Sequence, residues 1–331
     1  MTTSNDQASL VNPFGLSKVG DAARPTFIDI DGDLGTLIGN SWGNSRYFQN
    51  PGTASHPAFA AAVTHPYRLS VVDTDASPTL ADLDGNSHLD AGIGHSSGDT
   101  VLFKQSPGLT LTPSGTTTTV AEAARSDIGT LVLDTQPTAD VTIVLDDTSG
   151  QASASPASLI ILNFQDPQTN PYGLERVGSI AHPTFADLDA DGDLDALIGN
   201  RDGNSLYFQN TGTASSPAFA AAVTNPFGLS AVGYYANPTF ADLDGDGDLD
   251  AFVGNNAGDT LYFENTGDAS NPAFAAAVTN PFGLSDVGLS ASPTFADLDG
   301  DGDLDALVGN SNGDSLYFQN TGTASSPAFA A

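Results

Sequence analysis

The stretch Pro293–Asn320 reads PTFADLDGDGDLDALVGNSNGDSLYFQN, and its centre is a loop of alternating acids. Asp stands at every second position from Asp297 to Asp305, and Gly300 and Gly302 fall between three of these acids. Glycine permits the sharp bends of such a loop. Ca²⁺ takes roughly six to eight oxygen ligands, and acids at loop positions one, three, five and nine, with a backbone carbonyl at position seven, can supply them. The stretch therefore predicts a calcium-binding loop.

Short apolar segments on both sides of the loop predict β-strands. The expected strands of this unit are Thr294–Leu298, Leu304–Gly309, Ser315–Asn320 and Pro327–Ala331. The third follows an Asn-Gly-Asp turn, which is typical of a hairpin. No window of the chain shows a helical period of apolar residues. The unit is therefore expected to be a four-stranded antiparallel meander.

The unit occurs five times along the chain. Each copy begins with Pro-Thr-Phe or Pro-Thr-Leu, at Pro25, Pro78, Pro183, Pro238 and Pro293. A single meander cannot bury both of its faces, so the copies must pack face to face, as propeller blades or as a solenoid. The chain start, Ala8–Phe14, resembles the end that the last unit lacks, which favours a closed ring. We therefore predict an all-β fold, a β-propeller of four-stranded antiparallel blades with five repeat units.

Candidate metal ligands occur in all five units, but the sets are unequal. Units three to five carry complete sets: Asp187, Asp189, Asp191, Asp193 and Asp195; Asp242, Asp244, Asp246, Asp248 and Asp250; Asp297, Asp299, Asp301, Asp303 and Asp305. Unit two has Asp82, Asp84, Asn86 and Asp90, with Ser87 at the position of the second glycine and His88 at position seven. Unit one is shortened to Asp29, Asp31 and Asp33 and lacks the ninth-position acid. We predict three to five Ca²⁺ ions, bound tightly in units three to five, less tightly in unit two, and most weakly or not at all in unit one.

Two other interpretations of the loop fit its residues less well. Solvated Asp/Gly turns are common, but four or five like charges within nine residues repel one another strongly without a cation. A helix-loop-helix calcium site needs an acid at loop position twelve. That position holds Ile198, Val253 or Val308. Mg²⁺ is the lesser option, because its small octahedron tolerates crowded protein ligands poorly.

One segment does not follow the repeat. The domain organisation is therefore residues 1–106 as blades one and two, 107–167 as an inserted β-rich segment, and 168–331 as blades three to five closing on the N-terminus. Within the insertion we expect strands at Gly129–Asp134, Val141–Asp146 and Ser158–Asn163. Two alternatives stay open. The insertion adds strands beside unit two, with the last of them replacing that blade's fourth strand, or it forms a sixth blade.

The composition excludes several classes of function. Forty acidic residues against eight basic ones give a net charge of −32, which repels phosphate, so no nucleic-acid partner is expected. No run of 18 apolar residues is present, so no membrane insertion is expected. The N-terminal residues 1–15 lack the basic and apolar regions of a classical signal peptide. We expect a monomer or a part of a larger chain.

No catalytic residue is predicted, and no enzyme activity. The sequence contains no G-x-S-x-G motif, and no nucleophile–base pair can be argued. The five histidines show no ligand spacing and are expected at the surface or in loops. The recurring Tyr-Phe pairs of the third strands are expected to form the core between blades rather than platforms for sugars. These pairs are Tyr47–Phe48, Tyr207–Phe208, Tyr262–Phe263 and Tyr317–Phe318.

The loop and its flanking strands resemble the FG-GAP/VCBS repeats of integrin-like β-propellers. The resemblance implies a Ca²⁺ loop between the first two strands of each blade, and an extracellular or cell-surface module for adhesion that binds a glycan or a cell-surface protein. Two alternatives are a domain of a secreted polysaccharide-degrading enzyme of the lyase type and a passive structural repeat of a large adhesin. The insertion weakly resembles a Calx-β module.

Overall fold

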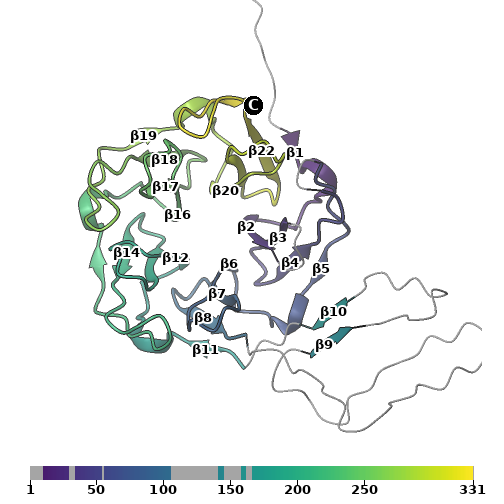
Figure 1. The fold of residues 1–331 in the computed structure, drawn as a ribbon, viewed down its shortest axis with the longest axis horizontal. Helices are drawn as coiled ribbons and strands as arrows, with labels where there is room; N and C mark the ends of the chain where they lie inside the picture. Colours follow the sequence, from purple (N-terminus) through teal and green to yellow (C-terminus); the bar gives the residue numbers. More distant parts are fainter. Residues whose placement is uncertain are drawn as a thin grey trace, which may run out of the picture.

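The computed structural model describes residues 10–29, 34–53, 56–105, 141–144, 158–161 and 166–330. Five antiparallel sheets surround a central axis and form a ring (Figure 1). Each sheet is one repeat unit, and we call the sheets blades 1 to 5 in the order of the units. The prediction of an all-β propeller with five four-stranded blades is confirmed.

Within each blade, strands that follow one another in the repeat pair antiparallel. Blade 1 contains β2 (Arg24–Asp29), β3 (Leu34–Gly39), β4 (Ser45–Phe48) and β5 (Val63–Thr64). Blade 2 contains β6 (Ser77–Ala81), β7 (Asp90–Gly94), β8 (Thr100–Phe103) and β11 (Gln168–Thr169). Blade 3 contains β12 (His182–Ala186), β13 (Asp195–Gly199), β14 (Ser205–Phe208) and β15 (Val223–Thr224). Blade 4 contains β16 (Asn237–Ala241), β17 (Asp250–Gly254), β18 (Thr260–Phe263) and β19 (Val278–Thr279). Blade 5 contains β20 (Ser292–Ala296), β21 (Asp305–Gly309), β22 (Ser315–Asn320), β23 (Phe329–Ala330) and β1 (Leu10–Val11).

The first strand of every blade lies nearest the axis. Strands β2, β6, β12, β16 and β20 contact one another in this order, and β20 contacts β2 again, so the ring closes (Figure 1). A short 3₁₀ turn follows each fourth strand and leads to the next blade. These turns are η1 (Pro13–Gly15), η2 (Pro66–Arg68), η3 (Pro171–Gly173), η4 (Pro226–Gly228) and η5 (Pro281–Gly283).

The N-terminal strand β1 closes the ring. Leu10 pairs with Tyr317 and Val11 with Leu316, so the chain start supplies the outer strand of blade 5. The expected ring closure is therefore present, but the expected position of the fourth strand was wrong. Phe329–Ala330 only extends the pairing at the end of β22, and in the other blades the fourth strand is the two-residue segment directly before the Asn-Pro or His-Pro turn. The Ala-rich stretch predicted as strand four is mostly a connection, because Pro327 cannot donate a ladder hydrogen bond.

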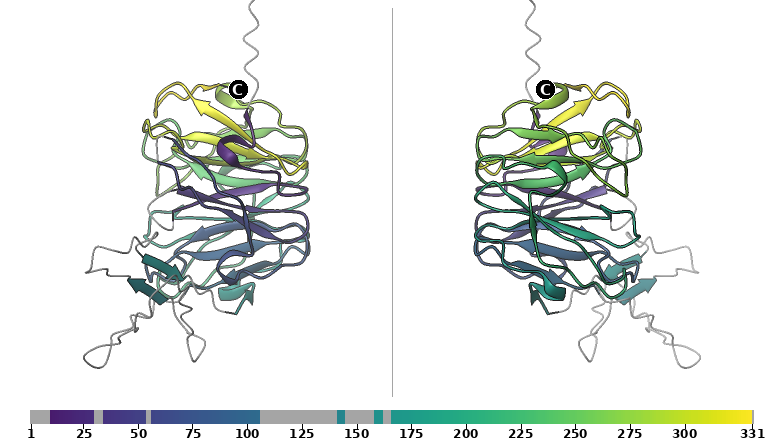
Figure 2. Two further views of the ribbon diagram at one scale, coloured as in Figure 1. Left: turned by 90° about the vertical axis from the view of Figure 1, so that its right-hand side faces the viewer. Right: turned by 90° about the vertical axis from the view of Figure 1, so that its left-hand side faces the viewer.

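The insertion contributes β9 (Val141–Val144) and β10 (Ser158–Ile161), which pair with each other in a separate two-stranded sheet. This sheet lies outside the ring (Figure 2). The fourth strand of blade 2 is β11, which pairs with Val101 and Leu102. The prediction that Ser158–Asn163 replaces this strand is therefore wrong, and so is a sixth blade in the ring. The repeat resumes immediately before Asn170, at a position where Val-Thr stands before His65, Asn225 and Asn280. The expected strand Gly129–Asp134 lies outside the described residues.

The third strands build the core between blades, as predicted. In β18, Tyr262 faces the cluster shared with blade 5, whereas Phe263 faces the cluster shared with blade 3. Successive side chains of a strand point to opposite faces, so one Tyr-Phe pair fills two interfaces. Phe263 is fully buried and Tyr262 is 6% exposed. Phe282 of η5 packs edge-on against Tyr262, with ring centroids 5.1 Å apart. Aromatic platforms for sugars are therefore not formed by these strands.

Candidate metal-binding loops

The acidic loop joins the first and second strands of each blade. In blade 4, Asp242 at position one accepts the backbone N–H of Gly245 at 2.8 Å and that of Gly247 at 3.1 Å. Both glycines have positive φ, 72° and 97°, a region that side chains with a Cβ disfavour. Asp297 binds Gly300 and Gly302 in the same way in blade 5. The first acid of the loop therefore folds the backbone into a tight turn.

This turn brings several carboxylates to one point. One oxygen from each of three acids lies within 4.8 Å of the others in blades 2 to 5. The groups are Asp82, Asp84 and Asp90; Asp187, Asp189 and Asp191; Asp242, Asp244 and Asp246; Asp297, Asp299 and Asp305. Position nine belongs to the group in blades 2 and 5 but not in blades 3 and 4. Like charges at this separation repel, and a shared divalent cation relieves the repulsion.

Several carboxylate oxygens of the loops are buried without a hydrogen-bond donor. They are Oδ1 of Asp189 and of Asp193 in blade 3, Oδ1 of Asp248 in blade 4 and Oδ1 of Asp84 in blade 2. Burial and the neighbouring loop acids raise the pKa of Asp193 and Asp248. Position seven was expected to offer only its backbone carbonyl, yet its carboxylate also has an unused oxygen in two blades. Buried acceptors without donors are costly, and oxygen atoms are the ligands of Ca²⁺, so the loops fit a bound calcium ion.

The ninth-position acid has a structural role in addition to any role as a ligand. Asp195 is 1% exposed, and its two oxygens accept the N–H of Asn210 at 2.7 Å, the N–H of Leu188 at 3.3 Å and the hydroxyl of Tyr207 at 2.8 Å. Asp250 and Asp305 make the corresponding bonds to Tyr262 and Tyr317. Burial raises the pKa of each of these three acids to about 6, although the hydrogen bonds act in the opposite direction.

Blade 2 contains a cation of its own. The ammonium of Lys104 lies 2.9 Å from Oδ2 of Asp84 at loop position three and 5.1 Å from the ring centre of Tyr172. Burial acts to lower the pKa of Lys104, but hydrogen bonds to Tyr172 and Asp84 outweigh it, so the pKa is raised. The equivalent residue in blades 3 and 5 is a neutral glutamine. Gln209 donates to Asp189 at 2.7 Å and Gln319 to Asp299 at 2.6 Å.

The other substitutions of unit two keep the loop shape. Ser87 takes the second glycine's place with φ 67°, and its N–H donates to Asp82 at 2.7 Å. Asn86 at position five accepts the N–H of His88, as the aspartates do in the other loops. The loop therefore folds alike in spite of its changed residues, at the cost of a left-handed conformation at Ser87.

The loop of blade 1 differs most. Asp29 ends β2 and is exposed, whereas Asp31 and Asp33 lie outside the described residues. Gly35 stands in the place of the ninth-position acid. A Cβ at Gly35 would lie 2.7 Å from the ring of Tyr47, so the tyrosine ring covers the position that the acid occupies in the other blades. No acidic group of the kind seen in blades 2 to 5 forms among the described residues of this loop.

Two histidines and one arginine are buried in the structure, which the sequence did not indicate. His182 is 2% exposed and lies in strand β12, so the expectation of a surface or loop position is wrong for it, whereas His95, which is 7% exposed, lies in the turn after β7. His182 and Arg24 are the first residues of β12 and β2, next to the axis of the ring, and Arg24 is 6% exposed. The residue directly before each Pro-Thr pair begins the first strand of its blade. A comparison of this position among the five units could therefore have pointed to Arg24 and His182.

Five blades around an axis, four of them with an acidic group in the loop between their first two strands, define a β-propeller with candidate metal loops. Residues 187–253 and 242–308 match the model of the FG-GAP-like repeat. These two matches and the five-bladed ring support an FG-GAP repeat family. Comparison with curated proteins gives no match for it. Among the described residues, no helix has the length and apolarity that a membrane crossing requires.

Proposed function

We propose that the protein is a calcium-stabilised β-propeller that acts as an extracellular binding module. The observation that supports calcium is the set of three carboxylates within 4.8 Å in each of blades 3, 4 and 5, together with buried carboxylate oxygens that lack donors. Calcium supplies the missing positive charge there and ties the first two strands of the blade together. Metal binding is then coupled to the stability of the fold.

We further propose that blade 2 binds calcium weakly, because the Lys104 ammonium already neutralises Asp84. The number of tightly bound ions is then three. The test is a metal count on desalted protein, combined with thermal unfolding in Ca²⁺ and in EGTA. Three ions per chain and a lower melting temperature in EGTA are expected. An unchanged melting temperature and a metal count near zero would contradict the proposal.

The face opposite the loops is the better candidate for a partner. Strand two of each blade runs from the acidic loop to the turn before strand three, so these turns lie on the other face of the ring. Trp42 in the turn of blade 1 is 56% exposed, and Tyr234, which is 63% exposed, lies beside the turn of blade 4, where its carbonyl accepts the N–H of Asn256. Exposed aromatic rings of this kind can stack on sugar rings, which favours a glycan over a surface protein.

A glycan array with calcium-loaded protein tests this part of the proposal. Trp42→Ala and Tyr234→Ala are expected to lose binding, whereas Val223→Ala, a change at an exposed apolar residue of an outer strand, is expected to retain it. Equal binding by all three variants would contradict a role for this face.

One small cavity bears on the alternative of a polysaccharide lyase. Arg24, His182 and Tyr235 come together beside a cavity of about 10 Å³. A cavity of this size holds about one water molecule and admits no sugar ring. FG-GAP propeller repeats are usually non-catalytic, and we propose a binding role without catalysis.

A further inference from the structure

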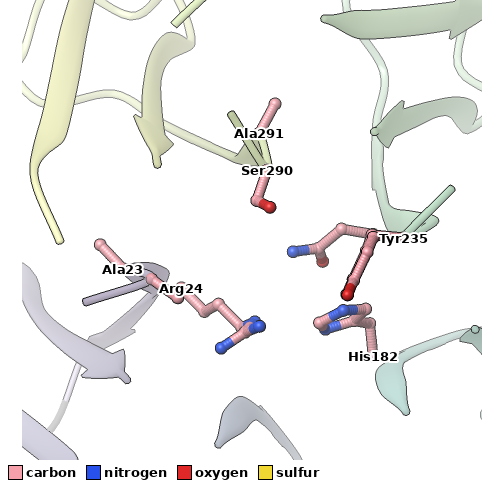
Figure 3. A pocket seen from close by; sticks show the side chains of 8 residues that line it. Ala23, Arg24, His182, Tyr235, Ser290 and Ala291 are labelled. Atoms are coloured by element: carbon pink, nitrogen blue, oxygen red, sulfur yellow. The ribbon is translucent and has the colours of Figure 1, made fainter. Parts of the chain in front are cut away.

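The axis of the ring contains an arginine and a histidine whose nitrogen atoms have no partner. Arg24 and His182 point toward one another across the channel, with Tyr235 and Ser290 nearby (Figure 3). Nη1 of Arg24 and Nδ1 of His182 are both buried, and neither has a hydrogen-bond partner. The two side chains belong to residues that are 6% and 2% exposed. Two buried, unpaired nitrogen atoms therefore face one small space.

The other side of the guanidinium is already satisfied. Nη2 of Arg24 donates to Oδ1 of Asp75 at 3.2 Å, which explains why an arginine is tolerated inside the ring. That ion pair does not involve Nη1. A guanidinium N–H can only donate, so the group missing at Nη1 must be an acceptor. The acceptor is either a water molecule or an anion.

The lining of the channel favours an anion. Two cavities adjoin Arg24, of about 10 Å³ and about 40 Å³, and among their lining residues Arg24 alone carries a formal charge. The remaining lining residues are Ala, Pro, Ser, Thr, Asn, His and Tyr, with no carboxylate. In a chain with 40 acidic residues this is an unusual environment. The carboxylate of Asp75 pairs with Nη2 and is not part of this lining, so Nη1 is left as a charged donor in a channel of low dielectric, where its attraction for an anion is stronger than in water.

A charged or imidazole side chain stands at this position of the repeat in two of the five blades. The first residue of the first strand is Arg24 in blade 1 and His182 in blade 3, but Ser77, Asn237 and Ser292 in the other three. Asn237 donates to the hydroxyl of Ser292 at 2.7 Å, so the polar side chains at this position in blades 4 and 5 are hydrogen-bonded to each other. Arg24 and His182 therefore break the symmetry of the ring at its centre. They lie in blades 1 and 3, away from the hydrogen bond that joins Asn237 and Ser292 in blades 4 and 5.

We propose that the channel binds one small inorganic anion of the halide class, held by Nη1 of Arg24 and by Nδ1 of His182 in the tautomer that carries a proton there. The space beside both groups is about the size that one water molecule needs, so a single-atom anion fits it better than sulfate or phosphate. The site does not depend on calcium in the loops, which lie at the ends of the first strands away from Arg24 and His182.

Bromide is the probe for the direct test, with calcium held constant in all samples. Crystals of the full chain grown in sodium bromide are expected to show an anomalous peak within hydrogen-bonding distance of Arg24 Nη1 and His182 Nδ1. Density without an anomalous signal at that place would identify a water molecule and overturn the proposal. Anomalous peaks only elsewhere on the protein would overturn it as well.

Thermal unfolding in solution provides a second test. Sodium chloride is expected to raise the melting temperature above that in sodium gluconate at equal concentration, because a ligand that binds the folded state stabilises it. Arg24→Gln is expected to lose this difference, and Arg201→Gln, the same charge change at an exposed arginine, to keep it. A chloride effect that survives in folded Arg24→Gln, or that is absent from the wild-type protein, would contradict the proposal. If Arg24→Gln does not fold, the bromide crystals of the wild-type protein decide alone.

Discussion

The hydroxyl of Tyr207 donates a hydrogen bond of 2.8 Å to the buried carboxylate of Asp195. The bond joins the third strand of blade 3 to the last residue of the acidic loop, and it recurs in blades 4 and 5. In blade 2, Leu102 takes the place of the tyrosine, and the pKa of the equivalent Asp90 is raised further, to about 7, by burial and by the charge of Asp84. The tyrosine therefore helps to keep the ninth-position acid ionised.

Tyr207→Phe is expected to destabilise the protein by roughly 1–3 kcal/mol, because it removes a hydrogen bond from a buried acid. The pKa of Asp195 should rise from about 6 toward the value of about 7 found for Asp90. Urea unfolding and NMR titration of the Asp195 carboxyl measure the two effects. An Asp195 pKa that stays the same in the variant would contradict the role of the tyrosine.

The metal-free protein is expected to lose stability as the pH rises from about 4 to about 7. Burial raises the folded-state pKa of Asp195, Asp250 and Asp305 to about 6 and that of Asp90 to about 7, from the ordinary value of 3.8. Between these values the folded state holds protons that the unfolded state has released, so the free energy of unfolding falls with pH. The loss is on the order of 3 kcal/mol for each acid.

Urea unfolding in EGTA across this pH range measures that effect, and repetition with calcium should weaken or reverse it, because calcium binds the deprotonated acids. A stability in EGTA that rises steadily from pH 4 to pH 7 would show that these acids are not buried as described.

Removal of one loop acid is expected to remove one calcium ion. Asp244→Asn takes a charge from the group of three acids in blade 4. The matched control is Asp202→Asn, because Asp202 is an exposed residue of a strand-connecting turn and blade 5 has Asn312 at the equivalent position. Isothermal titration calorimetry should give one ion fewer for Asp244→Asn and the wild-type number for Asp202→Asn. Equal numbers for both variants would rule out blade 4 as a site.

Lys104 and Gln209 offer a reciprocal exchange. Lys104→Gln removes the cation beside Asp84 and should raise the number of tightly bound calcium ions by one. Gln209→Lys places a cation beside Asp189 and should lower the number by one. The same titration measures both variants. If Lys104→Gln leaves the number unchanged while blades 3 to 5 bind calcium, the lysine does not explain the weak site.

The closing strand gives a fifth prediction. Asn12 accepts the N–H of Ser315 at 3.0 Å and donates to Asp314 at 2.8 Å, and Asn225 makes the equivalent bonds to Ser205 and Asn204 inside blade 3. Asn12→Ala is expected to cost about 1–2 kcal/mol of unfolding free energy, as much as Asn225→Ala, because the ring unfolds as a unit. Urea unfolding measures both costs. A negligible effect of Asn12→Ala alone would show that the ring opens easily at blade 5.

Much of the fold could be read from local pattern. The alternating acids, the Asn-Gly-Asp turn and the Pro-Thr-Phe repeat are features of neighbouring residues, and they predicted the five meanders and the third strand Ser315–Asn320 correctly. The alternation of Tyr262 and Phe263 likewise follows from the two-residue period of a strand, so the core between blades was predictable. Fourth strands of only two residues, such as Val223–Thr224, are too short to leave a periodic pattern, and the prediction placed them wrongly.

By itself, then, the sequence determined the repeat, its acidic loops and the complementarity of its two ends. Only the tertiary structure decided which distant residues meet. Lys104 reaches Asp84 because β8 returns beside the loop, and Arg24 faces His182 because closure of the ring brings blades 1 and 3 to a common axis. Such contacts join residues far apart in the chain, and their distances depend on the packing of all five blades, which no local pattern contains.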